Sequence, residues 1–328
     1  MSDLPLWTPL HAQLHRTLKL RQLLPKNQRL LIAVSGGQDS LCLIKLLLDL
    51  QPKWRWKLAI AHCNHRTRTD CEANALHVET LASAWSIPYY GAITDRSLQS
   101  EAAARLWRYE ALREIATAND YHYIVTGHTS SDRAETLLYN LIRGSGADGL
   151  QALTWQRSLD SGLQLIRPLL QVQRAATAQF CQAMQLPVWE DSTNQDLKYA
   201  RNRIRHELLP YLYNFNPQVE TALAQTAELL HSEVEYLEFT AQQLHAQAAC
   251  HPTEPLKLNC QVLQASPLAL QRRVLRQWLF QLLNRSPNFE QIEKLIALVY
   301  APNHTQTDPF FGGAIARVEN GWIFLTPP

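Results

Sequence analysis

The chain has 328 residues, and 46% of them are hydrophobic, so its composition excludes an intrinsically disordered protein. The length favours two domains over one. The formal net charge is only +2, so any nucleic-acid partner must be held by a local basic patch and not by the charge of the whole chain.

The N-terminal sequence and the cysteines predict a cytoplasmic protein. Residues 1–15 contain neither the continuous apolar core nor the small-residue cleavage pattern of a signal peptide. The most apolar stretch, residues 41–50, is too short to span a bilayer and contains Lys45 and Asp49, so we expect no membrane association. No Cys-x-x-Cys pair occurs among the six cysteines, which disfavours a structural zinc site and favours reduced thiols.

The first half of the chain alternates between short apolar runs and segments with helical periodicity. Strands are expected at residues 29–34, 57–62, 87–93 and 122–127, and helices at 39–50, 70–85, 100–118 and 132–143. This alternation predicts an α/β fold in which a parallel sheet has helices on both faces. Polar residues follow three of the strands, at 35–40, 62–65 and 127–132. Because ligands bind beyond the carboxyl ends of such strands, we expect one shared site there.

Helical periodicity dominates the second half of the chain. Helices are expected near residues 219–249, 267–284 and 288–300. The last segment predicts a β-hairpin that turns at Asn320 and Gly321, since this dipeptide is the strongest short hairpin signal. We therefore expect a catalytic domain of residues 1–215, followed by a smaller, mainly helical domain of residues 216–328.

The segment "SGGQDS", Ser35 to Ser40, joins the first expected strand to the first expected helix. Gly36 and Gly37 permit a sharp turn and a close approach of backbone N–H groups to a ligand. The helix directs the positive end of its dipole at the same place, which favours a bound phosphate. Asp39 repels phosphate unless a cation lies between them, so we expect Mg²⁺ there.

An ordinary tight turn is the alternative interpretation of this segment. In an ordinary tight turn, Asp39 interacts with the helix dipole only. Neither Gly-Lys-Ser/Thr nor Gly-x-Gly-x-x-Gly is present, so the segment is neither the usual NTPase loop nor a dinucleotide-binding loop.

The segment resembles the pyrophosphate loop of the ATP pyrophosphatases, which cleave ATP to AMP and pyrophosphate. Six further motifs narrow the family: "HCNHRTR" (62–68), "EAAARLWRY" (101–109), "GHTSSDRAET" (127–136), "RGSGADGL" (143–150), "EDSTN" (190–194) and "RNRIRHELLPYL" (201–212). In this order they resemble tRNA(Ile)-lysidine synthetase over residues 20–215. The chain has no room for the further C-terminal domain of longer members, so it resembles a short form.

The resemblance implies a sheet similar to that of the adenine nucleotide alpha hydrolases and a C-terminal domain, residues 216–328, that binds tRNA. It also implies a ligase reaction that joins free L-lysine to the wobble cytidine of an isoleucine tRNA with a CAU anticodon. ATP adenylates the C2 oxygen of the base, and the ε-amine of lysine then displaces AMP. Mg²⁺ is the expected metal, and the sequence leaves open whether the protein forms a homodimer.

Site residues follow from the resemblance in three groups. Nucleotide binding is implied for Ser35, Gly36, Gly37, Gln38, Asp39, Ser40 and His62. Catalytic roles are implied for Asp39, Arg105, Arg108, Asp132 and Glu135, with Asp39 and Asp132 as ligands of Mg²⁺. Contacts with tRNA are expected for Lys198, Arg201 and Arg205 in the densest basic cluster of the chain, beside aromatic residues suited to stacking on unpaired bases.

Each of these groups has a simpler alternative. Asp132 and Glu135 are three residues apart, so they share a helical face and suit Mg²⁺ or a lysine ammonium, but an acid at a helix start also interacts with the dipole alone. Arg105 and Arg108 suit phosphate, or they lie on a solvated face where Glu101 pairs with Arg105. A solvated face is the simpler interpretation of the basic cluster, but the low net charge of the whole chain favours a function for it.

Other features leave the metal and the function of the site open. His62, His65 and His128 permit a zinc site, but His-x-x-His without a third nearby ligand is a weak signal. The family pattern differs from this chain at Thr129, Ser131 and Arg133. Another tRNA-modifying or amide-forming synthetase of the same class, or a tRNA-binding module with an inactive nucleotide site, are the competing functions.

Overall fold

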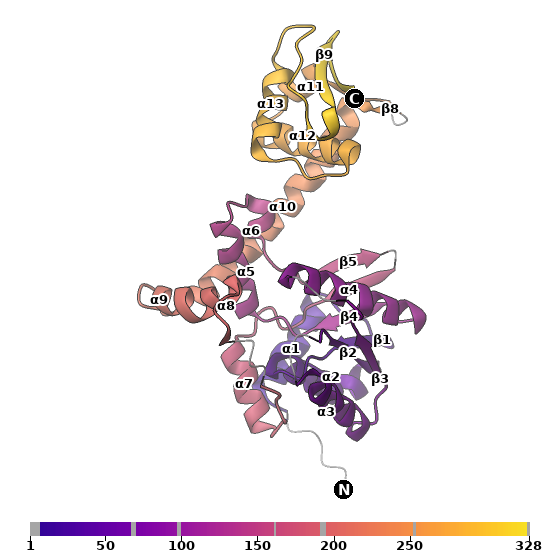
Figure 1. The fold of residues 1–328 in the computed structure, drawn as a ribbon, viewed down its shortest axis with the longest axis vertical. Coiled ribbons are helices and arrows are strands. Elements are labelled where there is room, and N and C mark those ends of the chain that lie inside the picture. The colour runs from indigo at the N-terminus through magenta and orange to yellow at the C-terminus, as the bar shows by residue number, and fades with distance from the viewer. Residues whose placement is uncertain are drawn as a thin grey trace. The chain divides into compact units, whose positions relative to one another are not determined.

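The computed structural model describes residues 7–66, 70–96, 100–160, 162–190, 195–251 and 254–326. Parts of the motifs at 62–68 and 190–194 therefore lie outside the described residues. The chain forms two compact units, Met1–Leu230 and His231–Pro328 (Figure 1). The division falls inside helix α10 (Val219–Ala248), further along the chain than the expected boundary near residue 215, which stays a prediction.

The first unit contains a six-stranded sheet with the strand order β3-β2-β1-β4-β6-β5. Its strands are β1 (Arg29–Ala33), β2 (Lys57–Asn64), β3 (Tyr89–Ile93), β4 (Tyr123–Thr126), β5 (Gln156–Asp160) and β6 (Leu163–Ile166). All neighbours pair in parallel except β5, which runs antiparallel to β6 at the edge. The four expected strands and the predominantly parallel sheet are confirmed, whereas the hairpin of β5 and β6 was not expected.

Helices cover both faces of this sheet (Figure 1). One face carries α1 (Pro9–Leu20), α2 (Gln38–Trp54), α3 (Cys71–Ala84) and α7 (Arg174–Ala183). The other face carries α4 (Glu101–Ala118). Alternation along β1 explains the two layers, because Leu30 and Ile32 belong to the first core and Leu31 belongs to the second.

A further group of helices completes the first unit. Its members are α5 (Ser130–Ile142), α6 (Ala147–Leu150), α8 (Ala200–Arg203), the π-helical turn η2 (Ile204–Leu208) and α9 (Leu209–Tyr213). The buried side chains of Leu138, Ile204 and Leu209 form a small core that packs η2 and α9 against α5. This packing brings the basic cluster next to the acids at the start of α5.

The second unit combines helices with an antiparallel sheet of the order β7-β8-β10-β9. Its elements after α10 are β7 (Ala249–His251), β8 (Glu254–Asn259), α11 (Cys260–Gln264), α12 (Leu268–Leu283), α13 (Phe289–Val299), the short 3₁₀ helix η3 (Phe311–Gly313), β9 (Ile315–Glu319) and β10 (Trp322–Thr326). Asn320 and Gly321 have φ angles of 52° and 79°, so the expected hairpin turn is confirmed. The strands β7 and β8 were not expected.

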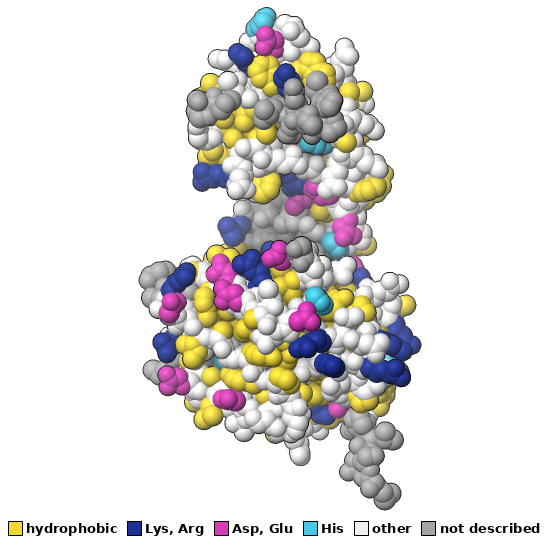
Figure 2. Space-filling view, turned by 90° about the vertical axis from the view of Figure 1, so that its right-hand side faces the viewer, with side chains coloured by type: hydrophobic (Ala, Val, Ile, Leu, Met, Phe, Trp, Pro, Cys, Tyr) yellow, Lys and Arg dark blue, Asp and Glu magenta, His cyan; other side chains and the backbone are white. Residues whose placement is uncertain are grey.

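The surface carries no dominant charge on the face drawn in Figure 2. Lys and Arg side chains lie there in several separate groups, with Asp and Glu side chains between them. Within the described part of the chain, no helix has both the length and the apolar character needed to cross a bilayer.

Candidate active site

Residues 35–40, which we call the loop cradle, connect β1 to α2 through a turn that only glycine accommodates. Gly36 has a φ of +88°, and a Cβ atom there would lie 2.5 Å from Oδ1 of Asn74. The side chain of Asn74, on α3, donates from Nδ2 to the carbonyl oxygen of Ser35 at 3.1 Å. The neighbouring helix α3 therefore fixes the path of the cradle.

The two serines of the loop cradle close the turn on itself. Ser40 Oγ accepts from the backbone N–H of Ser35 at 3.2 Å and donates to the carbonyl oxygen of Gly37 at 2.8 Å. Gly37 is the N-cap of α2, and no described side chain caps this helix start. The first N–H groups of α2 are therefore suited to an anion.

Gly127 allows the end of β4 to approach the loop cradle closely. A Cβ atom at this position would lie 2.8 Å from the carbonyl oxygen of Asp39 and 3.1 Å from the backbone nitrogen of Ser40. Any larger residue would displace the start of α2. Gly127 therefore permits the close packing of this strand end against the start of α2.

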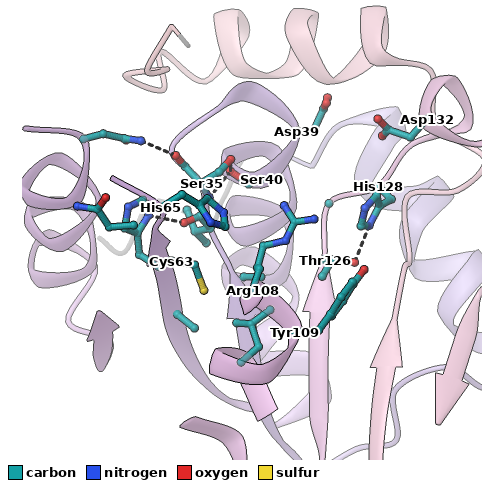
Figure 3. Close-up of a pocket in the computed structure, with 18 of the residues that line it drawn as sticks. Ser35, Asp39, Ser40, Cys63, His65, Arg108, Tyr109, Thr126, His128 and Asp132 are labelled. Carbon is teal, nitrogen blue, oxygen red and sulfur yellow. Dashed lines mark hydrogen bonds between the residues drawn. The ribbon is translucent and has the colours of Figure 1, made fainter. Parts of the chain in front are cut away.

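A cavity of about 430 Å³ opens beyond the ends of β1, β2 and β4 (Figure 3). Residues from all three strand ends line it, as do residues from α4 and α7; among them are Ser35, Asp39, Ser40, His62, His65, Arg108, His128, Asp132 and Arg174. Its size is typical of a small-molecule site. The structure therefore brings the polar residues that follow three separate strands into one cavity, as the sequence predicts.

Asp39 is held by α7, which the sequence did not connect with this site. Arg174 donates from Nε and Nη2 to Oδ2 of Asp39 at 3.0 and 2.8 Å, and the hydroxyl of Thr177 donates to Oδ1. Gln38 also turns toward α7, where its Nε2 donates to the carbonyl oxygen of Arg174 at 3.0 Å. The Gln38 side chain is thus engaged away from the cradle, so only its backbone is placed for nucleotide binding.

Asp132 lines the same cavity from the start of α5 (Figure 3). Its Oδ2 accepts from the backbone N–H and the hydroxyl of Thr129, both at 2.8 Å, and its Oδ1 lies 3.6 Å from Arg174 Nη2. Burial acts to raise the pKa of Asp132, but Arg174, His128 and Thr129 outweigh it and hold the pKa below its usual value. Asp132 is therefore ionised at neutral pH.

The donor set fits Mg²⁺. Asp39 and Asp132 come from two helices and face one shared cation, the guanidinium of Arg174. Mg²⁺ is commonly held by one or two carboxylates together with substrate phosphates. No group of three or more His, Cys, Asp or Glu residues suited to a metal exists in the described ranges, so a Mg²⁺ held by these two carboxylates would need phosphate oxygens and water as its other ligands.

The three histidines line the cavity individually. Nδ1 of His62 donates to the carbonyl oxygen of Val34 at 2.8 Å, which joins the ends of β2 and β1. Nδ1 of His128 lies 2.9 Å from the hydroxyl of Thr126 (Figure 3). Burial and the neighbouring arginines lower the pKa of His128 to about 3, so this ring is neutral at pH 7.

Arg105 and Arg108 lie on α4 and belong to a cluster of guanidinium groups around Tyr109. Their Cζ atoms lie 5.1 and 5.7 Å from the centre of the Tyr109 ring. Burial acts to raise the pKa of Tyr109, but Arg105, Arg167 and Arg108 outweigh it and lower the pKa. These arginines therefore create a positive field at the wall of the cavity.

A second cavity of about 680 Å³ adjoins the first, and the two share His65, Arg108, His128 and Asp132 as lining residues. Its other charged lining residues are Glu101, Arg105, Glu135, Lys198, Arg201 and Arg205. The described site thus offers two neighbouring compartments with Asp132 and Arg108 between them. The implied catalytic arginines and the implied tRNA contacts face the same space.

Glu135 is not a free carboxylate. Arg205 donates to both of its oxygens, at 2.6 Å from Nε and 2.7 Å from Nη2. The Glu135 side chain is only 4% exposed. From the sequence we expected Glu135 to act together with Asp132, and Arg205 to contact tRNA. In the structure, Glu135 on α5 pairs with Arg205 on η2. The alternative in which Arg205 lies on a solvated helix face is wrong, because the donors of its guanidinium group are bound to a buried carboxylate.

Arg205 belongs to a basic segment, residues 198–206, in which Lys198, Arg201 and Arg203 also have acidic partners. Nη1 of Arg201 lies 3.1 Å from Oε1 of Glu101, and Nζ of Lys198 lies 2.7 Å from Oδ2 of Asp196. Both pairs are substantially exposed, so they are weak and exchangeable. Arg201 and Lys198 are therefore available to other anions in a way that Arg205 is not.

The three positions that depart from the family pattern have partners of their own. Thr129 caps α5 through Asp132. Ser131 Oγ donates to Glu220 at 2.5 Å, and Nη1 of Arg133 lies 2.6 Å from Oε2 of Glu228. Both glutamates lie on α10, so the departures at 131 and 133 fasten the first part of α10 to α5.

Sequence reasoning missed Asn74, Thr177 and Arg174. Asn74 and Thr177 lie within helices and carry no local motif, and Arg174 is the first residue of α7. The available sequence signal was a polar residue on an otherwise apolar helix face, as for Asn74 and Thr177, which are 6% and 0% exposed in the structure. This pattern indicates that the polar side chain has a hydrogen-bond partner, but it does not identify that partner.

Comparisons with known proteins agree with this geometry. A PP-loop domain matches residues 10–212, and a TilS substrate binding domain matches residues 258–324. A protein of Nostoc sp. named tRNA(Ile)-lysidine synthase is 63% identical over 332 residues, which cover 97% of both chains. One of the same name from Synechocystis sp. is 51% identical, again over 97% of both chains.

A solved structure extends the comparison to the fold. A U34-tRNA thiolase from Methanococcus maripaludis superposes with a TM-score of 0.56 over 68% of this chain and 78% of its own, at 15% identity, which is a likeness of fold alone. The relatives of high identity and the matched domains confirm the resemblance read from the motifs. The chain belongs to the tRNA(Ile)-lysidine synthase family.

Proposed function

We propose that this protein ligates L-lysine to the C2 position of the wobble cytidine of tRNA(Ile) with a CAU anticodon, with release of AMP and pyrophosphate. The observation that carries the proposal is the pair of adjoining cavities that share Asp132 and Arg108. One cavity has the phosphate cradle of a PP-loop domain, and the other is lined by basic residues suited to RNA. The names of the close relatives supply the identity of the reaction.

ATP binds in the first cavity in this proposal. Its diphosphate lies against the backbone N–H groups of Gly37 and the first turn of α2, where the helix dipole favours negative charge. The adenine lies near the end of β2, beside His62. The cradle retains the β- and γ-phosphates as the leaving group, so adenylation of the base yields pyrophosphate.

Asp39 and Asp132 are the residues that would hold Mg²⁺. A bound ion would supply positive charge that neutralises the phosphates of ATP and the group that is transferred. Arg108, which lines both cavities, and Arg105 stabilise negative charge on the adenylyl group at the boundary between them. His128 is neutral there and supplies hydrogen bonds without adding charge.

The wobble cytidine and lysine meet in the second cavity. Arg201 and Lys198 exchange their exposed acidic partners for tRNA phosphates, and Tyr199 offers an aromatic face to an unpaired base. Glu101, once separated from Arg201, is the acid best placed to accept a lysine ammonium, since Arg205 occupies both oxygens of Glu135. Glu135 acts in this proposal by positioning Arg205 beside Asp132, from which Arg205 Nη2 lies 3.7 Å.

Residues 216–328 supply further tRNA contacts in this proposal, and a homodimer stays a prediction. The test is incubation with ATP, Mg²⁺, L-lysine and tRNA(Ile) with a CAU anticodon, followed by mass spectrometry of the nucleosides. A methionine tRNA with the same anticodon is the matched control. We expect lysidine in the isoleucine tRNA alone. Absence of lysidine with folded protein, or equal modification of both tRNAs, would refute the proposal.

A further inference from the structure

Arg174 joins the two carboxylates that are suited to Mg²⁺. Its guanidinium lies 2.8 and 3.0 Å from Oδ2 of Asp39 and 3.6 Å from Oδ1 of Asp132. Asp39 belongs to α2 and Asp132 to α5, so one side chain neutralises acids from two elements. The Arg174 side chain is 33% exposed and forms part of the wall of the first cavity. It is therefore accessible to whatever enters that cavity.

The backbone of Arg174 is fixed independently of this side chain. Its N–H donates to Ser131 Oγ at 3.1 Å, and its carbonyl oxygen accepts from Gln38 Nε2 at 3.0 Å. Its position at the start of α7 is thus tied to the loop cradle and to α5. The long Arg174 side chain is therefore able to change hydrogen-bond partners while the backbone of Arg174 stays in place.

The phosphates of ATP are a second possible partner for the Arg174 guanidinium. A guanidinium carries a planar fork of donors that matches phosphate as well as carboxylate. A divalent cation on Asp39 and Asp132 removes the negative charge that holds Arg174, because like charges repel across such short distances. The phosphates of ATP, in the same cavity, then offer replacement acceptors.

We propose that Arg174 is an exchangeable counter-ion, which neutralises Asp39 and Asp132 before substrate binds, competes with the divalent cation for them, and transfers to the phosphates of ATP. The inference rests on the proposed function in one respect, since it takes Asp39 and Asp132 as the cation site. It assigns Arg174 a role in the order of binding that the loop motif alone does not indicate.

The test measures Mn²⁺ binding to the full-length protein without ATP or tRNA, by electron paramagnetic resonance, and pyrophosphate binding by calorimetry. An opposite charge beside a carboxylate changes its affinity for a proton about tenfold or more. We therefore expect Arg174→Gln to bind Mn²⁺ about tenfold more tightly than the wild type and to bind pyrophosphate more weakly. Arg174→Lys keeps the charge without the fork, so it should restore the Mn²⁺ affinity but not the pyrophosphate affinity.

Two further variants complete the experiment. Arg113→Gln is the matched control, because Arg113 lies on α4 with its side chain 49% exposed and its nearest acid, Asp160, at 3.9 Å. Loss of Mn²⁺ binding in Asp39→Asn together with equal affinity in the wild type and Arg174→Gln would overturn the counter-ion role and leave the metal site standing. Undiminished Mn²⁺ binding in Asp39→Asn would overturn the metal site, and the inference with it.

Discussion

The loop cradle, residues 35–40, and the basic segment, residues 198–206, both face the site, but they are built differently. The cradle depends on backbone geometry, in which Gly36 adopts a positive φ and the serine hydroxyls close the turn. The basic segment depends on charged side chains, and four of its cations already have acidic partners. The sequence motif of the loop cradle therefore predicts the function of these residues more directly than the run of basic residues predicts the function of the basic segment.

The basic segment also shows that neighbouring arginines differ in kind. Arg205 is bound to Glu135 through a bidentate pair in which the acid is 4% exposed, whereas Glu101, the partner of Arg201, is 48% exposed. A buried pair is costly to break, and an exposed pair contributes little. We therefore expect Arg205 to act as a structural residue and Arg201 as a binding residue, although they are four residues apart on the same segment.

Asp39→Asn should have the largest effect, because it removes charge from the cradle without altering its shape. The amide still accepts from Arg174 and donates to Thr177, so circular dichroism and thermal unfolding should match the wild type. Loss of a carboxylate that would act on the reacting phosphates through a shared Mg²⁺ should lower kcat about a hundredfold or more. Asp95→Asn, an acid 86% exposed, is the matched control, and near-normal turnover in folded Asp39→Asn would remove Asp39 from the mechanism.

Arg205→Ala should lower the free energy of unfolding by about 3 kcal/mol, since it leaves Glu135 buried without its partner. Urea unfolding measures this directly. The double variant Arg205→Met with Glu135→Leu should recover most of the loss, because an apolar pair needs no compensation. A stability change below about 0.5 kcal/mol in Arg205→Ala would mean that Arg205 and Arg201 are equivalent after all.

Gly127→Ala tests the claim that the cradle is set by close backbone packing. The new methyl group would lie 2.8 Å from the carbonyl oxygen of Asp39, so α2 must shift at a cost of about 1–3 kcal/mol. ATP binding, followed by calorimetry, should weaken as well. Gly146→Ala is the control, because nothing lies within 4 Å of its Cβ position. Equal ATP affinity in both variants would contradict the close packing.

Arg201→Ala should have the smallest effect on stability, below about 1 kcal/mol, because its pair with Glu101 is exposed. Its effect should appear in tRNA binding, where loss of one phosphate contact flattens the salt dependence by about one unit of slope. ATP affinity should not change. The measurement is tRNA affinity across a salt series, and an unchanged slope in the folded variant would return Arg201 to a solvated face.

Much of the fold was predictable because apolar runs of strand length identify buried strands. The strands β1, β2 and β4 have this character, and the turn at Asn320 and Gly321 has a local signal. The edge strand β3 was also expected, although none of its residues is buried. The edge strand β5, "QRSLD", is largely exposed and polar, so it carries no such pattern. The strands β7 and β8 escaped prediction as well.

The site was predictable where the chemistry is local. The glycines and Asp39 follow one another in a motif, whereas Arg174 and Thr177 reach Asp39 from a helix far along the chain. The tertiary structure determines which charged side chains pair, and the pairing of Arg205 with Glu135 depends on the packing of η2 on α5. A single sequence therefore does not predict such pairs.

The central claim is that the loop cradle retains the diphosphate of ATP while the wobble cytidine is adenylated. The most direct measurement uses ATP labelled with ³²P at the α- or the γ-phosphate, together with L-lysine and tRNA(Ile) with a CAU anticodon. We predict labelled AMP from the first substrate and labelled pyrophosphate from the second, in amounts equal to the lysidine formed. ADP and inorganic phosphate as the main products, or AMP formed equally without that tRNA, would contradict the account.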